Sequence, residues 1–237
     1  MNVTLKFDAE YASEVMNEIP AGYIDKTICG CGLTTVALEN LVHTVIAVPT
    51  IYLAQNKAAQ YPNERFAGKV LAVWGETSKF EIEDYVKNTD WLKIIVTYDS
   101  LPKVEYLLDT YKCKLIIDES NELLSRTKLR PEAIHKLFEI AKKYRKTVSF
   151  ISATPTPLEY MPDWVKKLKQ IKIEWANSTK TIPILCKSTY PFKSLNHQFL
   201  TPLNENGFLT INGNNNECIT IKRQSFLSIQ LIKHQKS

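Results

Sequence analysis

Residues 27–35, TICGCGLTT, carry the residue types that a phosphate-binding loop uses. Gly30 and Gly32 allow a tight backbone turn that aims successive amides at phosphate oxygens, and Cys31 is small enough to fit between them. Thr34 stands where such a loop places a magnesium-binding hydroxyl. The loop follows an expected strand and enters an expected helix, whose dipole would favour an anion. Taken alone, the pattern favours an ordinary strand–helix turn.

A pair of carboxylates ends the stretch KLIIDES, residues 114–120. An apolar strand there runs into Asp118 and Glu119, and the carboxyl edge of a parallel sheet is where ligands bind. One carboxylate could hold magnesium through water while the other orients or deprotonates an attacking water. Alternatively, Asp118 caps the next helix and Glu119 favours its first turn. Both interpretations remain open at this point.

Two hydroxyls end a third apolar strand, in FISATPTP, residues 150–157. Ser152 and Thr154, on either side of Ala153, could hydrogen-bond the carboxylates of a neighbouring strand. A Ser/Thr/Pro turn that closes a strand is common, so the stretch says little alone.

The elements that must position these residues alternate along the chain from residue 22 onward. Short β-branched runs predict strands at 23–28, 43–48, 69–74, 93–98, 114–118 and 147–152. Helical patterns lie between them at 33–41, 50–60, 79–87, 101–111 and 131–145. This alternation predicts an α/β fold with a mostly parallel sheet and helices on both faces.

The character of the sequence changes after about residue 160, where prolines become frequent. Residues 208–221, FLTINGNNNECITI, predict two short strands about an Asn-Gly turn. We therefore expect a first domain over residues 1–160, and a linker with an incomplete or truncated second domain over 161–237.

The composition excludes few classes of protein. The 237-residue chain has a formal charge of +5 and a pI of 8.8, which is compatible with an acidic polymer partner without requiring one. Its five cysteines are scattered, so neither a zinc site nor a disulfide framework is indicated. The sequence shows no signal peptide and no apolar run long enough for a bilayer, which predicts a cytoplasmic protein without a membrane partner.

Five stretches, taken together and in order, resemble the superfamily-two helicases and translocases, the DEAD/DEAH-like group. They match the family's phosphate loop, motif Ia, motif Ib, D-E-x-x box and S-A-T motif, and they read Gly30-Cys31-Gly32-x-Thr34, PTIYLAQ (49–55), VTYDSL (96–101), IIDES (116–120) and SATP (152–155). The resemblance covers about residues 15–160, which is one whole RecA-like P-loop domain. A different P-loop enzyme, such as a nucleotide kinase, is disfavoured by SATP and the motif Ia match.

The resemblance implies ATP and Mg²⁺ as ligands and assigns roles to individual residues. The phosphate-loop positions are Gly30, Cys31, Gly32, Leu33, Thr34 and Thr35. Thr34 and Asp118 match the metal-binding positions, and Glu119 beside Asp118 matches the catalytic base. Ser152, Ala153 and Thr154 match the motif that couples hydrolysis to movement on nucleic acid.

Nucleic acid is the partner that the resemblance implies, with DNA favoured over RNA. The matching backbone-contact residues are Pro49, Thr50, Gln55, Thr97 and Tyr98. Hydroxyls and backbone amides there would bind phosphates with little sequence preference. For Thr50 and Tyr98 the alternatives, a helix cap and a strand-end core residue, stay open.

Two departures from the family's pattern qualify the expected activity. Leu33 replaces the lysine of the phosphate loop, and losing such a contact costs about 100-fold or more in rate. Lys26 is the nearest cation in sequence, and Leu33→Lys should raise nucleotide affinity if the remaining site is intact. The second departure is that no Q-x-x-G-R-x-x-R motif follows residue 160, so a second RecA-like domain or chain is a possible partner.

The sequence thus predicts a helicase-like ATPase domain that binds ATP, Mg²⁺ and single-stranded or duplex nucleic acid, and that is impaired or incomplete as a lone chain. The alternative is a catalytically inactive nucleic-acid-binding or scaffold protein that keeps the helicase fold.

Overall fold

The computed structural model describes residues 2–61, 69–176, 208–212, 217–224 and 228–235. The chain forms two compact units, Met1–Ser178 and Thr179–Ser237, which are described separately. The first unit thus runs past residue 160, the boundary that we expect from the sequence.

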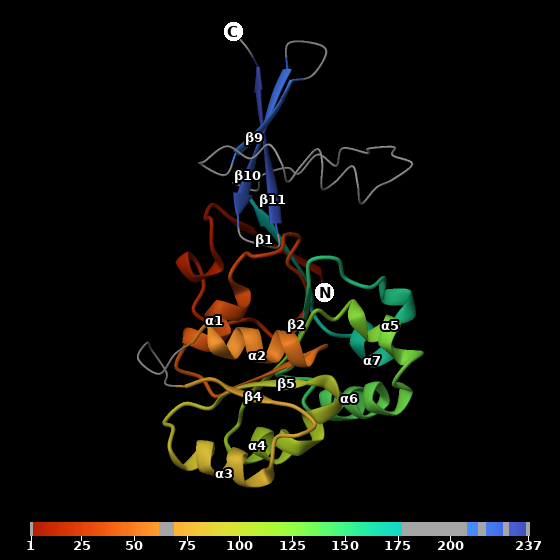
Figure 1. The fold of residues 1–237 in the computed structure, drawn as a ribbon. Helices are drawn as coiled ribbons and strands as arrows, with labels where there is room; N and C mark the ends of the chain where they lie inside the picture. Colours follow the sequence, from red (N-terminus) through yellow and green to blue (C-terminus); the bar gives the residue numbers. More distant parts are fainter. Residues whose placement is uncertain (1, 62–68, 177–207, 213–216, 225–227, 236–237) are drawn as a thin grey trace. The chain divides into compact units, whose positions relative to one another are not determined.

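An eight-stranded sheet, parallel throughout, forms the centre of the first unit (Figure 1). Its spatial order is β1-β8-β2-β7-β6-β3-β5-β4. The strands are β1 Asn2–Phe7, β2 Gly22–Asp25, β3 Thr44–Val48, β4 Leu71–Val73, β5 Lys93–Thr97, β6 Lys114–Asp118, β7 Ser149–Ser152 and β8 Gln170–Trp175. The α/β class and the parallel sheet are confirmed, and the sequence prediction lacks only the edge strand β1 and its neighbour β8.

Helices cover both faces of this sheet, as predicted. Neighbouring residues of β3 alternate between two apolar clusters, with Val45 in one and Ile46 in the other. The Ile46 cluster packs under α1 (Leu33–Glu39) and α2 (Ile51–Ala59). The Val45 cluster packs under α3 Lys79–Lys87, α4 Glu105–Thr110, α5 Glu122–Thr127, α6 Pro131–Lys143 and α7 Asp163–Lys166. Figure 1 shows α1 and α2 on the opposite side of the sheet from α3, α4 and α6.

Local chemistry accounts for where several elements begin. Thr50 caps α2, because its Oγ1 accepts a hydrogen bond of 3.2 Å from Leu53 N. Ser78 and Glu81 form a reciprocal capping box at the start of α3. The predicted helix at 101–111 is divided into the 3-10 helix η2 (Tyr98–Val104) and α4. Two further 3-10 turns are η1 Ala12–Glu14 and η3 Leu158–Tyr160.

The register of the central strands brings three motif-bearing ends to one edge. Asp25 of β2 lies opposite Ser152 of β7, and Asp118 of β6 lies opposite Ile151 of the same strand. The strand β7 therefore separates the strand that leads into the glycine loop from the strand that ends in the carboxylates. Side chains that follow these strands can meet at the carboxyl edge of the sheet.

The second unit contains a three-stranded antiparallel sheet of order β11-β10-β9. Its strands are β9 Phe208–Asn212, β10 Glu217–Gln224 and β11 Ser228–Gln235. The two strands predicted within 208–221 are present and pair, and β11 is an addition. The predicted Asn-Gly turn extends into residues 213–216, which lie outside the described residues.

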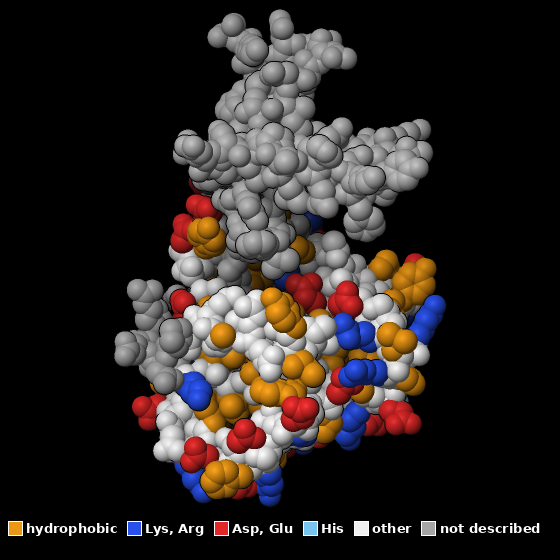
Figure 2. All heavy atoms as spheres, viewed as in Figure 1, with side chains coloured by type: hydrophobic (Ala, Val, Ile, Leu, Met, Phe, Trp, Pro, Cys, Tyr) orange, Lys and Arg blue, Asp and Glu red, His pale blue; other side chains and the backbone are white. Residues whose placement is uncertain are grey.

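Acidic and basic side chains both occur over the face of the first unit in Figure 2. They are interspersed there, with apolar side chains between them, so this face is neither predominantly positive nor predominantly negative. None of the described helices combines the length and the apolarity needed to cross a membrane.

Candidate functional site

The glycine loop between β2 and α1 adopts the left-handed backbone that its glycines allow. The φ angles are +75° at Gly30 and +81° at Gly32, a region that other residues adopt at a cost. A side chain at Gly30 would meet no atom within 4 Å, so this turn faces open space. Between them, Cys31 is buried, and its carbonyl accepts a hydrogen bond of 2.8 Å from Ala12 N. The loop is thus anchored on one side and open on the other.

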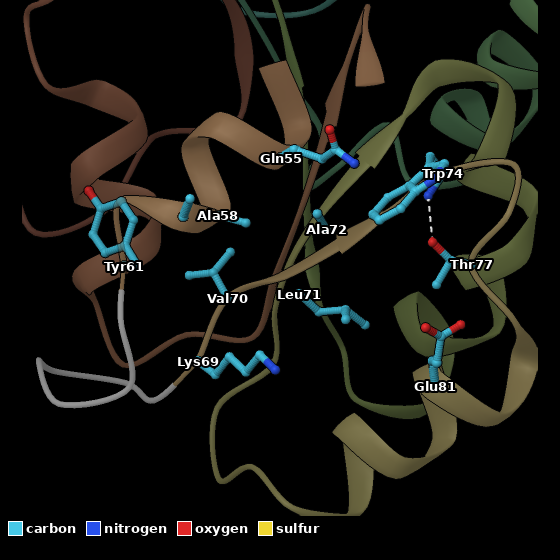
Figure 3. A pocket seen from close by; sticks show the side chains of 11 residues that line it. Gln55, Ala58, Tyr61, Lys69, Val70, Leu71, Ala72, Trp74, Thr77 and Glu81 are labelled. Atoms are coloured by element: carbon cyan, nitrogen blue, oxygen red, sulfur yellow. Dashed lines mark hydrogen bonds between the residues drawn. The ribbon is translucent and has the colours of Figure 1, made fainter. Parts of the chain in front are cut away.

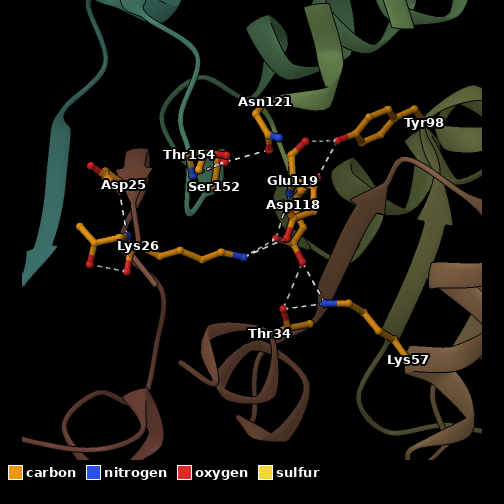
Figure 4. A network of polar contacts seen from close by, with 11 residues as sticks. Asp25, Lys26, Thr34, Lys57, Tyr98, Asp118, Glu119, Asn121, Ser152 and Thr154 are labelled. Atoms are coloured by element: carbon orange, nitrogen blue, oxygen red, sulfur yellow. Dashed lines mark hydrogen bonds and ion pairs between the residues drawn. The ribbon is translucent and has the colours of Figure 1, made fainter. Parts of the chain in front are cut away.

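Asp118, at the end of β6, is the centre of a polar network (Figure 4). Its Oδ2 accepts hydrogen bonds from Thr34 Oγ1 at 3.1 Å and from Lys57 Nζ at 2.9 Å. Lys57 Nζ also donates to Thr34 Oγ1 at 2.9 Å. On the other oxygen, Oδ1 accepts from Glu119 N at 3.0 Å and lies 3.5 Å from Lys26 Nζ. The structure therefore joins the predicted loop threonine to the predicted metal-binding carboxylate.

The network keeps Asp118 and Lys26 charged despite their burial. Asp118 is 1% exposed, and this burial acts to raise its pKa, but Lys57 and Lys26 hold the pKa below its ordinary value. Burial acts to lower the pKa of Lys26, yet the carboxylates of Asp118 and Glu119 leave it raised. Asp118 is thus an ionised carboxylate and Lys26 a charged ammonium at neutral pH.

Lys26 is held at its main chain by two other strands. Its amide donates to Ser152 O at 2.9 Å, and its carbonyl accepts from Trp175 Nε1 at 3.0 Å. Its ammonium then reaches Glu119 Oε1 at 3.1 Å. Trp175 lies at the end of β8, so a strand that the sequence pattern does not predict helps to position this cation.

Glu119 has a backbone that costs energy to hold. Its φ is +52°, which is uncommon for a residue with a Cβ atom and is concentrated at functional sites. Tyr98 supports this turn, because its hydroxyl donates to Asp118 O at 2.6 Å and lies 3.1 Å from Glu119 O. The side chain of Glu119 remains 34% exposed and lies at the site entrance.

The S-A-T turn is tied to the residue three positions after Asp118. Ser152 Oγ donates to Asn121 Oδ1 at 2.8 Å and accepts from Thr154 N at 3.0 Å. Ala153 is partly buried and the Thr154 side chain is exposed. The partner of Ser152 is thus the amide of Asn121 and not one of the carboxylates that the sequence suggests, and the sequence pattern does not single out Asn121.

The predicted nucleic-acid residues lie in different environments. Gln55 is exposed, in a groove between α2 and the edge strand β4 that also contains Trp74 and Thr77 (Figure 3). Thr50 serves as the cap of α2. The remaining three are buried, namely Pro49, Thr97 and Tyr98. Tyr98, at 2% exposure, has no side-chain surface with which to touch a strand.

Leu33 is a core residue, which revises one sequence expectation. Its side chain is 3% exposed and belongs to the apolar cluster beneath α1 and α2. A lysine there would exchange apolar packing for a charge, so Leu33→Lys is a destabilising change and not a simple restoration of the site.

Lys57, on α2, is the functional candidate that sequence reasoning misses. The only signal is helical spacing, since Lys57 follows the core residue Ala54 by three positions and shares its face.

A cavity of about 280 Å³ lies between the glycine loop and α2. Residues 29–35 of the loop form one side, including Thr35, and Lys57 with its neighbours Asn56 and Gln60 forms another. Lys26 and Glu119 complete the wall near the sheet edge. The volume lies just below the ~300–1,000 Å³ of pockets that hold drug-sized ligands, so the cavity is large enough for a phosphate chain.

The oxygen donors at this site suit a hard cation that keeps most of its own water. Among the described residues, no group of three or more His, Cys, Asp or Glu side chains could hold a metal. Magnesium, however, is usually bound through one or two protein oxygens together with waters and substrate phosphates. Thr34 Oγ1 and Asp118 Oδ2, 3.1 Å apart, are such a pair, and they already share one cation, the Lys57 ammonium.

Neither protein-family models nor curated proteins match this sequence. The case for a function therefore depends on the arrangement of the site.

Proposed function

We propose that the first unit is a helicase-type, RecA-like P-loop domain that binds ATP with Mg²⁺ beside residues 29–35. The observation that supports this most is the contact between Thr34 and Asp118, 84 residues apart in sequence. The resemblance implies that the phosphate loop and the D-E-x-x box share a metal ion. Thr34 of the first and Asp118 of the second lie within hydrogen-bonding distance of each other.

The residues divide the work of binding as follows. The open backbone at Gly30 receives phosphate oxygens, and Lys26 and Lys57 balance their charge. Thr34 and Asp118 would hold Mg²⁺, which neutralises phosphate charge when it is bound. Glu119 lies at the entrance, where it can orient a water molecule once Lys26 releases it.

Nucleic acid is the partner in this proposal, at the exposed start of α2. Tyr52 is 71% exposed there, and Ile51 and Gln55 are exposed beside it. An aromatic ring on such a surface can stack on a base, and the Gln55 amide can bind a phosphate.

A second candidate function is a nucleotide-independent binding or scaffold protein. The ion pairs favour it, because Lys57 occupies the oxygens of the metal position and Lys26 occupies the carboxylate of Glu119. In that case nucleic acid would bind in a salt-sensitive way and ATP would change nothing.

The proposal is tested by titrating a fluorescent ATP analogue into the protein with and without Mg²⁺. We expect saturable, magnesium-dependent binding that Asp118→Ala weakens and that Asp84→Ala, at an exposed acid on α3, leaves unchanged. If neither the wild-type protein nor Asp118→Ala changes the fluorescence at millimolar nucleotide, ATP binding is refuted. Anisotropy of labelled single-stranded DNA, measured with and without ATP, then separates the two candidate functions.

A further inference from the structure

We propose that Lys57 supplies the phosphate-binding charge that the glycine loop lacks at position 33. This inference rests on the proposed function and names the residue that performs one part of it. The cation then comes from α2, the helix that lines the same cavity as the loop. Figure 4 shows the Lys57 side chain reaching from α2 toward Thr34 and Asp118.

The first argument is the set of donors that Lys57 has available. An ammonium group has three donors, and Lys57 uses two of them, on Thr34 Oγ1 and Asp118 Oδ2, both at 2.9 Å. Its side chain is 20% exposed and lines the cavity. The third donor is therefore available to a ligand on the cavity side.

Lys93 shows what a purely structural lysine looks like in this protein. It is 0% exposed, and its Nζ donates to Ala37 O at 2.8 Å, Asn40 Oδ1 at 2.7 Å and Val42 O at 2.7 Å. All three donors are satisfied inside the protein, at the end of α1. Lys57 differs from Lys93 in two ways, since one of its three donors has no hydrogen-bond partner among the described residues and its side chain is partly exposed.

The second argument is the charge of the cavity wall. Lys26, Lys57 and Glu119 line the cavity, whereas Asp118 lies behind them at 1% exposure. The wall thus exposes two ammonium groups and one carboxylate, while Asp118 behind them brings the net charge of the four groups to zero. An anion entering beside Gly30 meets the Lys57 ammonium together with the open backbone of the loop.

The third argument is that Asp118 already has other partners for its charge. Glu119 N donates to its Oδ1, and Lys26 Nζ lies 3.5 Å from the same oxygen. Lys57 also contacts Thr34, so it bridges the two oxygens of the proposed metal position and does not pair with Asp118 alone. Before Thr34 and Asp118 can both face a metal ion, Lys57 has to leave them, and the cavity is the open direction.

The test compares three substitutions of Lys57 for their affinity for magnesium tripolyphosphate and for a fluorescent ATP analogue. Lys57→Met removes the charge and all donors, and Lys57→Gln removes the charge while keeping an amide donor for Asp118 and Thr34. Lys57→Arg keeps the charge. Lys79→Met is the matched control, because Lys79 lies on α3 with a side chain that is 82% exposed. Thermal melting shows which variants are folded.

We expect Lys57→Met and Lys57→Gln to weaken both ligands by about tenfold or more, and Lys57→Arg and Lys79→Met to stay within about threefold of wild type. Folded Lys57→Met and Lys57→Gln proteins with wild-type affinity for both ligands would overturn the inference, and would leave the proposed function standing. Absence of any nucleotide or tripolyphosphate binding by the wild-type protein would overturn both.

Discussion

Thr34 Oγ1 donates a hydrogen bond of 3.1 Å to Asp118 Oδ2, and Lys57 Nζ lies 2.9 Å from both oxygens. The first residue lies in the first turn of α1, the second ends β6, and the third comes from α2. This triangle holds together three elements that only the folded sheet brings near one another. It is also the place where a magnesium ion and a phosphate chain would have to fit.

Asp118→Asn should destabilise the protein as well as weaken magnesium-dependent nucleotide binding. The substitution leaves the buried ammonium of Lys26 and the partly buried ammonium of Lys57 without their main counter-charge, which costs about 3 kcal/mol of unfolding free energy. Urea denaturation measures this loss. Asp84→Asn, on the exposed face of α3, should unfold like the wild-type protein. An Asp118→Asn protein as stable as wild type would show that the ion pairs contribute nothing.

The same carboxylate predicts how stability depends on pH. The pKa of Asp118 lies lower in the folded protein than its ordinary value, so the unfolded chain binds more protons in acid. The contribution of Asp118 is therefore complete above its unfolded pKa of about 3.9 and is lost as pH falls through the folded value. The difference in unfolding free energy between wild type and Asp118→Asn should be constant from pH 5 to 7 and shrink below pH 4 (approximate bounds). A difference that grows in acid would contradict this assignment.

Tyr98→Phe should separate structural support from nucleic-acid contact. The substitution removes the 2.6 Å hydrogen bond to Asp118 O and should cost about 1–2 kcal/mol of stability. Because the ring is buried, affinity for single-stranded DNA should stay unchanged. Gln55→Ala, at an exposed position of α2, should do the reverse, lowering DNA affinity with little change in stability. If DNA affinity falls in Tyr98→Phe and not in Gln55→Ala, Tyr98 and not Gln55 contributes to DNA binding.

Leu33→Lys should lower the unfolding free energy by about 2 kcal/mol, because it removes a buried apolar side chain. It should not raise nucleotide affinity, since the side chain at this position packs into the core beneath α1. Leu33→Met keeps the volume and the apolar surface and serves as the control. Higher nucleotide affinity in a folded Leu33→Lys protein would show that position 33 can still present a cation to the site.

The sequence predicts those site residues that directly follow a strand. Asp118 and Ser152 each end an apolar run, and parallel strands bring such positions to one edge, whereas Thr34 is predicted from the glycine loop that precedes it. Periodicity likewise predicts six of the eight strands in the sheet, because buried parallel strands are continuously apolar. The edge strand β1, exposed at alternate residues, and its partner β8 lack that signal.

The side chains that complete the site could not be predicted in the same way. Lys57 lies in the last turn of α2, and which face of that helix meets the loop depends on how α2 packs on the sheet. Trp175 positions Lys26 through a strand that is far away in sequence. Leu33 stands where the resemblance implies a lysine, and only the folded structure shows that its side chain is buried in the core.

Hydrogen–deuterium exchange with and without the magnesium complex of ATP tests the central claim most directly, because it reports where a nucleotide binds. We predict slower exchange of the amides of residues 29–35 and 118–121 on ligand addition, with α3 at Lys79–Lys87 unchanged. The same protection should weaken in Lys57→Met. Unaltered exchange across 29–35 at saturating nucleotide, or protection confined to other segments, would contradict a phosphate site at the glycine loop.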